Sequence, residues 1–253
     1  MRSLSSLYAL FMLAGLGVAG TAMAGVTAAD IEQAETQVFK PGDNRLAIAD
    51  MLATQPPRLN LAVRLPDGTQ RPLGYIDDTI YHTENGDVVR VQMAHINGNR
   101  QIDLTQASLD LLPRKHYSQS AKRTIDLNYG EEAVTGSYEV AGEEAVAVND
   151  PVGGPAFDSN HIDLIARAIP LEEGFAADIA TYERAAPDST DTAVLYRVAY
   201  EGEEDTGGAL VAIVSYARHG GDKTKIYLDP ESRSLVRIEF ASGSAVMVMT
   251  PAE

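Results

Sequence analysis

The sequence predicts a mainly β protein, in which a long antiparallel meander curls into a half-barrel or open barrel. A central helix is expected on its concave face, with short helices at the N-terminal end. Three observations predict this fold class. From Leu59 onward, apolar residues recur at every second position. Asn85-Gly86 and Asn97-Gly98 mark tight reversals between such runs. Helical spacing returns later in the chain near residues 158–169.

The start of the chain has the pattern of a cleaved secretory signal, residues 1–24. Arg2 gives a basic start, residues 7–18 are apolar, and Ala22-Met23-Ala24 supplies the small residues that a signal peptidase reads. The apolar stretch is short for a membrane span, although a retained anchor is the alternative. We therefore expect cleavage after Ala24, a periplasmic or secreted location and no transmembrane anchor after processing.

A helical segment is expected next, over residues 25–57. Residues 27–38 and 43–54 have apolar side chains at helical spacing. Pro56-Pro57 ends this segment, because proline lacks an N–H group and restricts the residue before it to extended conformations.

Residues 58–253 are expected to form one antiparallel domain. Short alternating runs follow one another there, separated by Gly, Pro and Asn-Gly turns. The predicted strands are 59–65, 79–83, 87–96, 99–104, 124–129, 133–140, 144–148, 177–182, 193–200, 209–216, 224–228, 235–240 and 245–249.

The run over residues 87–96 predicts which side of the sheet is covered. Val89, Val91 and Met93 fall on one face, and Arg90 and Gln92 fall on the other. This pattern predicts that Val91 and Met93 line the covered, concave side.

The central helix near 158–169 has clear limits. Asp158 or Ser159 can accept the free N–H groups of its first turn, and Pro170 ends it. Its apolar residues are more numerous than a surface helix needs, which suits a helix lying against a sheet. They are Ile162, Leu164, Ile165, Ala168 and Ile169.

Composition limits the partners. The formal net charge is −16, which argues against nucleic acid or an anionic membrane surface as a partner. The same charge is also explained by solubility alone. The chain has no cysteine, which excludes disulfides and a lipid anchor that requires one.

The sequence supports no catalytic residue, metal ligand or cofactor. His-Glu-x-x-His, the phosphate-binding loop and the Gly-x-Ser-x-Gly elbow are absent, as is a cysteine nucleophile. His82 and His95 fall in neighbouring strands and could form a metal pair, although single histidines are the favoured interpretation. His161 and Asp163 lie two apart on a helix, which is poor spacing for a metal site.

Acidic pairs and clusters raise the question of calcium. Asp77-Asp78 and residues 201–205 are examples, and the latter comes closest to a calcium site. None of the acidic clusters repeats the spacing of a calcium loop, so solvated charges at turns are the favoured interpretation.

A resemblance adds to this reading. FDSNHIDLIARAIPLEEGF at 157–175 resembles the central signature of a family of exported bacterial domains of unknown function. Residues 108–117, 134–138 and 225–240 resemble further parts of that pattern, so the likeness covers roughly residues 75–250. Such domains resemble LolA/LolB-type lipoprotein carriers, which implies a half-barrel lined by apolar groups and covered by helices. The chain departs from typical members in having no Trp.

The predicted function is that of an exported, non-catalytic binder or carrier of a hydrophobic ligand, a lipid or a lipoprotein. The expected apolar lining consists of Val91, Met93, Leu164, Ile165, Ile169 and Phe175. The alternative is an envelope structural or protein-interaction module without a ligand cavity, whose partner is a cell-envelope protein. A hydrolase, in which His161 or another histidine meets Ser and Asp, is the less favoured third hypothesis.

Overall fold

The structure is a computed structural model, and it describes residues 38–190 and 192–252. The predicted signal peptide, residues 1–24, lies outside the described residues. So does the predicted helix 27–38, except for its last residue. That residue, Val38, belongs to a short strand, β1 (Val38–Phe39), rather than to a helix.

The described part of the chain is mainly β, as predicted. Its strands join in one open sheet of 16 strands, in the order β1-β11-β12-β13-β14-β15-β16-β2-β3-β4-β5-β6-β7-β8-β9, with β10 also on β11. The strands after β1 are β2 (Arg58–Arg64), β3 (Gln70–His82), β4 (Val88–Ile96), β5 (Asn99–Ala107), β6 (Pro113–Ser120), β7 (Arg123–Tyr129), β8 (Ala133–Val140), β9 (Val146–Pro151), β10 (Phe157–Asp158), β11 (Ala176–Tyr182), β12 (Ala193–Asp205), β13 (Leu210–Arg218), β14 (Thr224–Leu228), β15 (Leu235–Ser242) and β16 (Ala245–Pro251).

The pairing is that of a meander. Consecutive strands pair antiparallel from β2 to β9 and from β11 to β16, while β1 and β10 pair parallel with β11. The last strand, β16, returns to pair with β2, with Val248 opposite Ala62. This closing pair joins the first and second halves of the chain into a continuous sheet.

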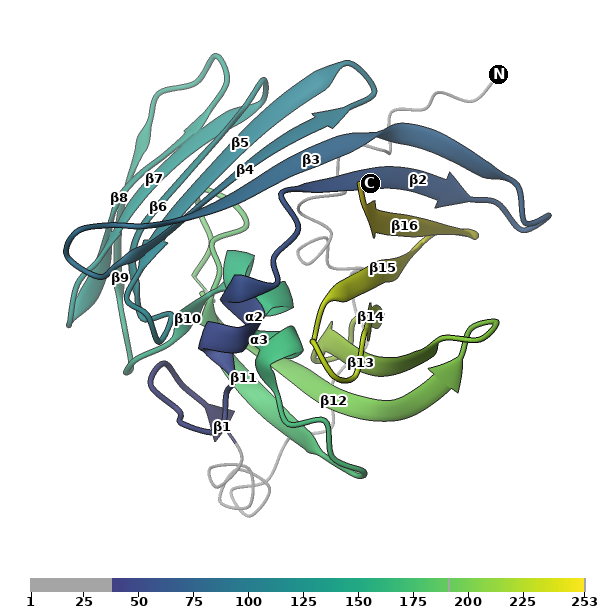
Figure 1. Ribbon diagram of the computed structural model, residues 1–253. Helices are drawn as coiled ribbons and strands as arrows, with labels where there is room; N and C mark the ends of the chain where they lie inside the picture. The colour runs from purple at the N-terminus through teal and green to yellow at the C-terminus, as the bar shows by residue number, and fades with distance from the viewer. Residues whose placement is uncertain (1–37, 191, 253) are drawn as a thin grey trace.

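Two helices lie inside the curve of the sheet (Figure 1). They are α2 (Ile48–Ala53) and α3 (Ile162–Ala168), and α3 follows a 3₁₀ turn, η3 (Ser159–His161). The two helices pack on each other, and α3 also contacts β13 and β14. Apolar side chains from strands that are distant in sequence therefore meet around α3.

The Asn97-Gly98 reversal forms as predicted. Asn97 has a φ of 50° and Gly98 a φ of 79°, and Ile96 pairs with Asn99 across the turn. Positive φ at both central residues is the requirement of a type I′ hairpin, which Asn and Gly meet at low steric cost.

The helix predicted over 43–54 is shorter than expected. Only Ile48–Ala53 is helical, because Asp43 accepts hydrogen bonds from the backbone N–H of Arg45 and from its guanidinium. This local turn competes with helix formation. The backbone N–H of Ala47 donates instead to the carbonyl of Ala168, at 2.8 Å, which ties the start of α2 to the end of α3.

The interpretation of the acidic clusters as solvated charges at turns is wrong at Asp78. The acidic residues of 201–205 are exposed beside the turn at Gly207-Gly208, as expected, although they belong to the end of β12, whose register shifts by a bulge between Tyr200 and Gly202. Asp78 belongs to β3 and is only 1% exposed. Alternation alone did not reveal these strands, because acidic side chains interrupt the apolar pattern.

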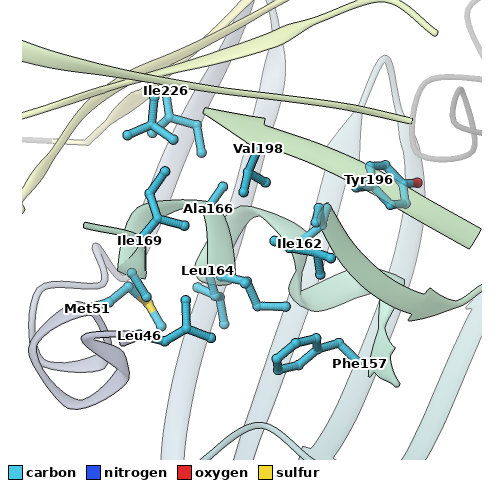
Figure 2. Close-up of a cluster of buried hydrophobic side chains, with 14 of the residues drawn as sticks. Leu46, Met51, Phe157, Ile162, Leu164, Ala166, Ile169, Tyr196, Val198 and Ile226 are labelled. Atoms are coloured by element: carbon cyan, nitrogen blue, oxygen red, sulfur yellow. The ribbon is translucent and has the colours of Figure 1, made fainter. Parts of the chain in front are cut away.

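Two clusters of buried apolar side chains fill the inside of the sheet. The larger one surrounds α3 and draws on α2 and on β11 to β15. Figure 2 shows Leu164 of α3, and Ile169 directly after that helix, next to Met51 of α2 and Leu46 just before it. The smaller one lies on β7 to β9 and includes Tyr182 at the end of β11.

Candidate functional site around helix α3

Helix α3 begins and ends as the sequence indicates. Asp158 caps the preceding turn by accepting a hydrogen bond from the N–H of Asn160, at 2.8 Å. The helix ends where Ile169 becomes extended, directly before Pro170. Arg233, from the loop before β15, donates to the carbonyls of Arg167 and Ile169, both at 2.9 Å. The carbonyls left free at the helix end are thereby partly satisfied.

The α3 residues predicted to line a ligand cavity lie in a filled core instead. Leu164, Ile165 and Ile169 are all 0% exposed and belong to the larger cluster. Phe175 packs against the edge of that cluster, with its ring stacked on Phe39 at a centroid separation of 5.9 Å. Neither of the two clefts described below is lined by any of these residues.

Val91 and Met93 lie on the wrong side for the predicted lining. Arg90, one position from Val91, is 1% exposed and bonds to Asp163 of α3. Successive side chains of a strand point to opposite faces, so Val91 and Met93 point away from α3. The apolar alternation of β4 thus marked the outer face, and the inner face carries the buried arginine.

Arg90 is the centre of a buried ionic network. Its Nη2 lies 2.6 Å from Asp78 Oδ2 and 2.7 Å from Asp163 Oδ2, and its Nη1 donates to the carbonyl of Asn160 at 2.9 Å. Burial on its own would lower the pKa of the guanidinium, but Asp163 and Asp78 outweigh it and hold that pKa well above its usual value. The network joins β3 and β4 to the start of α3.

A second polar cluster surrounds Asp158. His116 Nδ1 lies 2.9 Å from its Oδ2, and the Tyr129 hydroxyl donates to the same oxygen at 2.6 Å. Burial would raise the pKa of the Asp158 carboxyl, but the neighbouring His116 outweighs it and holds the pKa well below its usual range. Asp158 therefore has two tasks, since it caps the turn before α3 and anchors two strands of the sheet.

His161 is buried rather than exposed on the helix. It is 1% exposed, and its Nε2 lies 2.7 Å from the Thr105 hydroxyl. Among the described residues, His161 Nε2 meets this threonine rather than the serine that the hydrolase hypothesis required. Burial lowers the pKa of His161 to about 4.

The buried His161 makes stability depend on pH. Its pKa is 6.5 in the unfolded chain and about 4 in the fold, so its contribution is present above pH 6.5 and is lost as pH falls toward 4. The difference corresponds to about 3 kcal/mol. The charged or titratable groups near His161 are Asp158, Arg90, Asp163 and His116. The pKa of His116 is raised in the fold, so its contribution to the unfolding free energy changes with pH in the opposite direction to that of His161.

We predict that His161→Gln flattens the fall in unfolding free energy between pH 6.5 and 4, because glutamine takes up no proton. Urea unfolding at a series of pH values measures this. His219→Gln is the matched control, because the His219 side chain is 54% exposed. An acid slope equal to that of the unchanged protein would show that His161 is not the group responsible.

The histidines considered as a metal pair do not face each other. His95 lies opposite Tyr75 and stacks on its ring at 4.7 Å, while His82 lies opposite Val88. In the part of the chain that the structure describes, no group of three or more His, Cys, Asp or Glu side chains has the arrangement of a metal site.

The described residues form a polar cleft and a separate apolar groove. A polar cleft of about 50 Å³ is bordered by His116, Ser118 and Asn160. An apolar groove of about 310 Å³ runs beside α2 and is lined by Ala49, Leu52, Ala53, His82 and Leu109.

Comparison with known protein families gives a match for this chain. Residues 78–250 match the family described as protein of unknown function, DUF3108. The chain belongs to this family. No curated protein matches the sequence.

The DUF3108 match agrees with the predicted uncharacterised family and with the extent expected for it. It begins at Asp78 and therefore includes the whole Arg90 network as well as the polar cluster at Asp158. The match carries no link to the LolA/LolB-type carriers, so that part of the resemblance stays a prediction. No helix within residues 38–190 and 192–252 is long and apolar enough to cross a membrane.

The strand residues that complete the site are not evident from the sequence of this DUF3108 chain. Alternation predicts an outer face for Arg90, and nothing local to His116 or Tyr129 indicates a role. One signal in the sequence indicates that such partners exist. Asp158 and Asp163 stand at the start of a helix too apolar to be exposed, so their carboxylates require partners from other elements.

Proposed function

We propose that this protein is an exported, non-catalytic binding protein that takes a hydrophobic ligand in the groove beside α2. The finer description of the fold belongs to the same proposal: a half-barrel with α3 on its concave face, as in LolA/LolB-type carriers. The observation that carries the proposal is the apolar groove itself, about 310 Å³ in volume. This is at the lower end of the range of ligand sites, and the lining is mainly apolar with one polar group, as is usual for such sites.

The groove lies at a different place from the ligand site that the sequence predicted, which was lined by side chains of α3. The space under α3 is occupied by fully buried side chains, whereas Leu109 at the groove is 56% exposed. Contiguous exposed apolar surface marks binding sites, and Leu109 adds exposed apolar area to the lining of the groove. A single acyl chain, or an apolar molecule of similar bulk, suits its size.

The loop that supplies Leu109 is anchored at both ends and at Leu111. Leu111 has a φ of 61°, an unfavourable conformation for a bulky side chain, and is 0% exposed in the larger core cluster. Ser108 and Leu112 close the loop with backbone hydrogen bonds, such as Ser108 N–H to the Leu112 carbonyl at 3.0 Å. The buried Leu111 anchors the loop, so Leu109 is presented to the groove before any ligand arrives.

His82 is the polar residue of the lining. A polar group at one side of an apolar site fixes the orientation of a ligand that has a polar head. The proposed ligand is therefore amphiphilic, with its apolar part against Leu52 and Leu109 and its polar end toward His82.

We predict that Leu109→Asp weakens binding of the fluorescent apolar probe N-phenyl-1-naphthylamine by about tenfold or more, because a charge in an apolar site is costly to desolvate. Leu210→Asp is the matched control, because Leu210 is 50% exposed and lies on β13, away from the groove. Fluorescence titration measures both. Equal affinities of the two variants would contradict the location of the site.

A second function is favoured by one observation, the filled interior. An envelope protein-interaction module needs no cavity, and the complete burial of Leu164, Ile165 and Ile169 agrees with that role. If the probe binds neither the unchanged protein nor the variants, the interaction module becomes the better account, with a cell-envelope protein as partner.

A further inference from the structure

Strand β9 is a free edge of the sheet. It stands at one end of the strand order, and β8 is its only partner among the described strands (Figure 1). A free edge leaves a row of backbone N–H and C=O groups without partners, and such a row is a template for a further strand. With six residues, β9 is long enough to pair with one.

One hydrogen bond shows which backbone groups of β9 face the free side. The N–H of Val152 donates to the carbonyl of Glu132 at 3.0 Å, one step beyond the paired residues Pro151 and Ala133. In an antiparallel pair, hydrogen-bonded and non-hydrogen-bonded positions alternate along the strand. The register of β8 and β9 has no shift. The even-numbered residues of β9 therefore direct their backbone groups to β8, and the odd-numbered residues direct theirs to the free side.

The outward positions are Ala147, Asn149 and Pro151, and all three residues are exposed. Proline has no N–H group, and within sheets it is found at edge positions where that group would face solvent. Its place at an outward position of β9 agrees with the direction derived from the Val152 hydrogen bond. Ala147 and Asn149 thus offer both a donor and an acceptor to an added strand.

The inner face of this edge is apolar. Val148 is 3% exposed and belongs to the smaller core cluster. Val146, two positions earlier, points to the same face and is 43% exposed. An apolar side chain on the neighbouring position of an added strand would cover Val146.

Acidic side chains border the same edge. Glu131 and Glu132 lie in the turn before β8, Glu139 lies on β8, and Glu143 and Glu144 lie in the loop before β9. All five are exposed, and none forms an ion pair with another described residue. Complementary charge steers a partner and suppresses wrong ones, so this border favours a basic segment.

We infer that β9 accepts an added strand, which is an extended segment of a partner protein in which apolar residues alternate with lysine or arginine. Its backbone pairs with Ala147 and Asn149, its apolar residues cover Val146, and its basic residues meet the acidic border. No residue of β9 or of this border lines the apolar groove. The inference therefore does not depend on the proposed hydrophobic ligand.

The test uses a synthetic peptide of alternating valine and lysine, with an amidated C-terminus and a fluorescein label at the other end. Fluorescence anisotropy measures its binding to the protein. We expect saturable binding that weakens as sodium chloride is added. The same peptide with glutamate in place of lysine should not bind. The peptide with N-methylated backbone amides cannot donate hydrogen bonds, and its affinity should be about tenfold lower or less.

Two pairs of substitutions locate the charge that the peptide meets. Glu143→Gln combined with Glu144→Gln should weaken binding about fivefold at low salt, because two carboxylates beside the edge lose their charge. Glu203→Gln combined with Glu204→Gln is the matched control, because these glutamates are also adjacent and exposed but lie on β12. The control should leave the affinity unchanged.

Hydrogen exchange followed by nuclear magnetic resonance locates the paired backbone without any substitution. In the free protein, the amides of Ala147 and Asn149 should exchange much faster than that of Val148, which faces β8. Saturation with the peptide should slow exchange at Ala147 and Asn149.

Four results would overturn the inference. The first is the absence of saturable peptide binding. The second is equal affinity of the N-methylated peptide, because attraction between charges would then act without strand pairing. The third is unchanged exchange at Ala147 and Asn149 in the saturated complex, which would place the peptide elsewhere. The fourth is an equal loss of affinity in the two pairs of glutamine substitutions.

Discussion

Arg90→Met should destabilise the protein by about 3 to 5 kcal/mol, because it removes the cation between the buried Asp78 carboxylate and the partly buried Asp163 carboxylate and leaves their charges uncompensated. Methionine keeps much of the side-chain volume, so the expected loss reports charge more than packing. Asp78 is 1% exposed and lies 2.6 Å from Arg90, and Asp163 lies 2.7 Å away on α3. A loss of this size is a large part of the stability of an ordinary domain. Urea unfolding followed by circular dichroism measures it.

Two further variants separate the network from a general effect of losing arginine. Arg114→Met removes a cation whose side chain is 55% exposed and pairs with Asp87, so it should cost less than about 1 kcal/mol. Adding Asp78→Asn and Asp163→Asn to Arg90→Met should recover part of the loss, since the unpaired charges disappear. If Arg90→Met and Arg114→Met lower the free energy of unfolding by the same amount, the network does not hold α3 in place.

Ile165→Asp should weaken the fold by several kcal/mol or prevent folding. Ile165 is 0% exposed in the larger core cluster, so aspartate there would bury a charge among apolar side chains. The measurement is the melting temperature by circular dichroism, together with the yield of soluble protein.

Leu195→Asp provides the comparison for this variant. Leu195 is 39% exposed on β12, so the same chemical change there should shift the melting temperature little. A melting temperature retained in Ile165→Asp would mean that α3 is not packed against the sheet, and the filled interior would have to be abandoned.

Local patterns predicted most of the sheet. Alternation and turn residues placed β7, β8 and β14 to within one residue of their ends, and Asn97-Gly98 formed the expected hairpin. β6 was missed because its residues are mostly polar and show no apolar alternation. β1 and β10 were missed because each has only two residues, too few for any period to be visible. Their pairing with β11 depends on contacts between distant parts of the chain.

The face of β4 could not be predicted from alternation. Val91 and Met93 are more apolar than Arg90 and Gln92, yet the structure buries Arg90 fully. A buried arginine requires carboxylates from other elements, here Asp78 of β3 and Asp163 of α3. One strand read alone does not contain that information, because its partners come from separate segments.

The capping role of Asp158 could be predicted, but the rest of its surroundings could not. An acceptor before a helix needs only local sequence, and the bond to Asn160 formed as expected. Its contacts with His116 and Tyr129 join residues 42 and 29 positions away. Such contacts follow from the order of strands in the sheet, which the sequence pattern did not specify.

Native mass spectrometry of the protein, purified gently from its own cells and followed by organic extraction, tests the proposed function most directly. The account predicts one apolar molecule per chain in the unchanged protein, and its loss in Leu109→Asp but not in Leu210→Asp. A ligand-free mass that stays unchanged after incubation with envelope lipids would contradict it, and the protein would then be better understood as an interaction module.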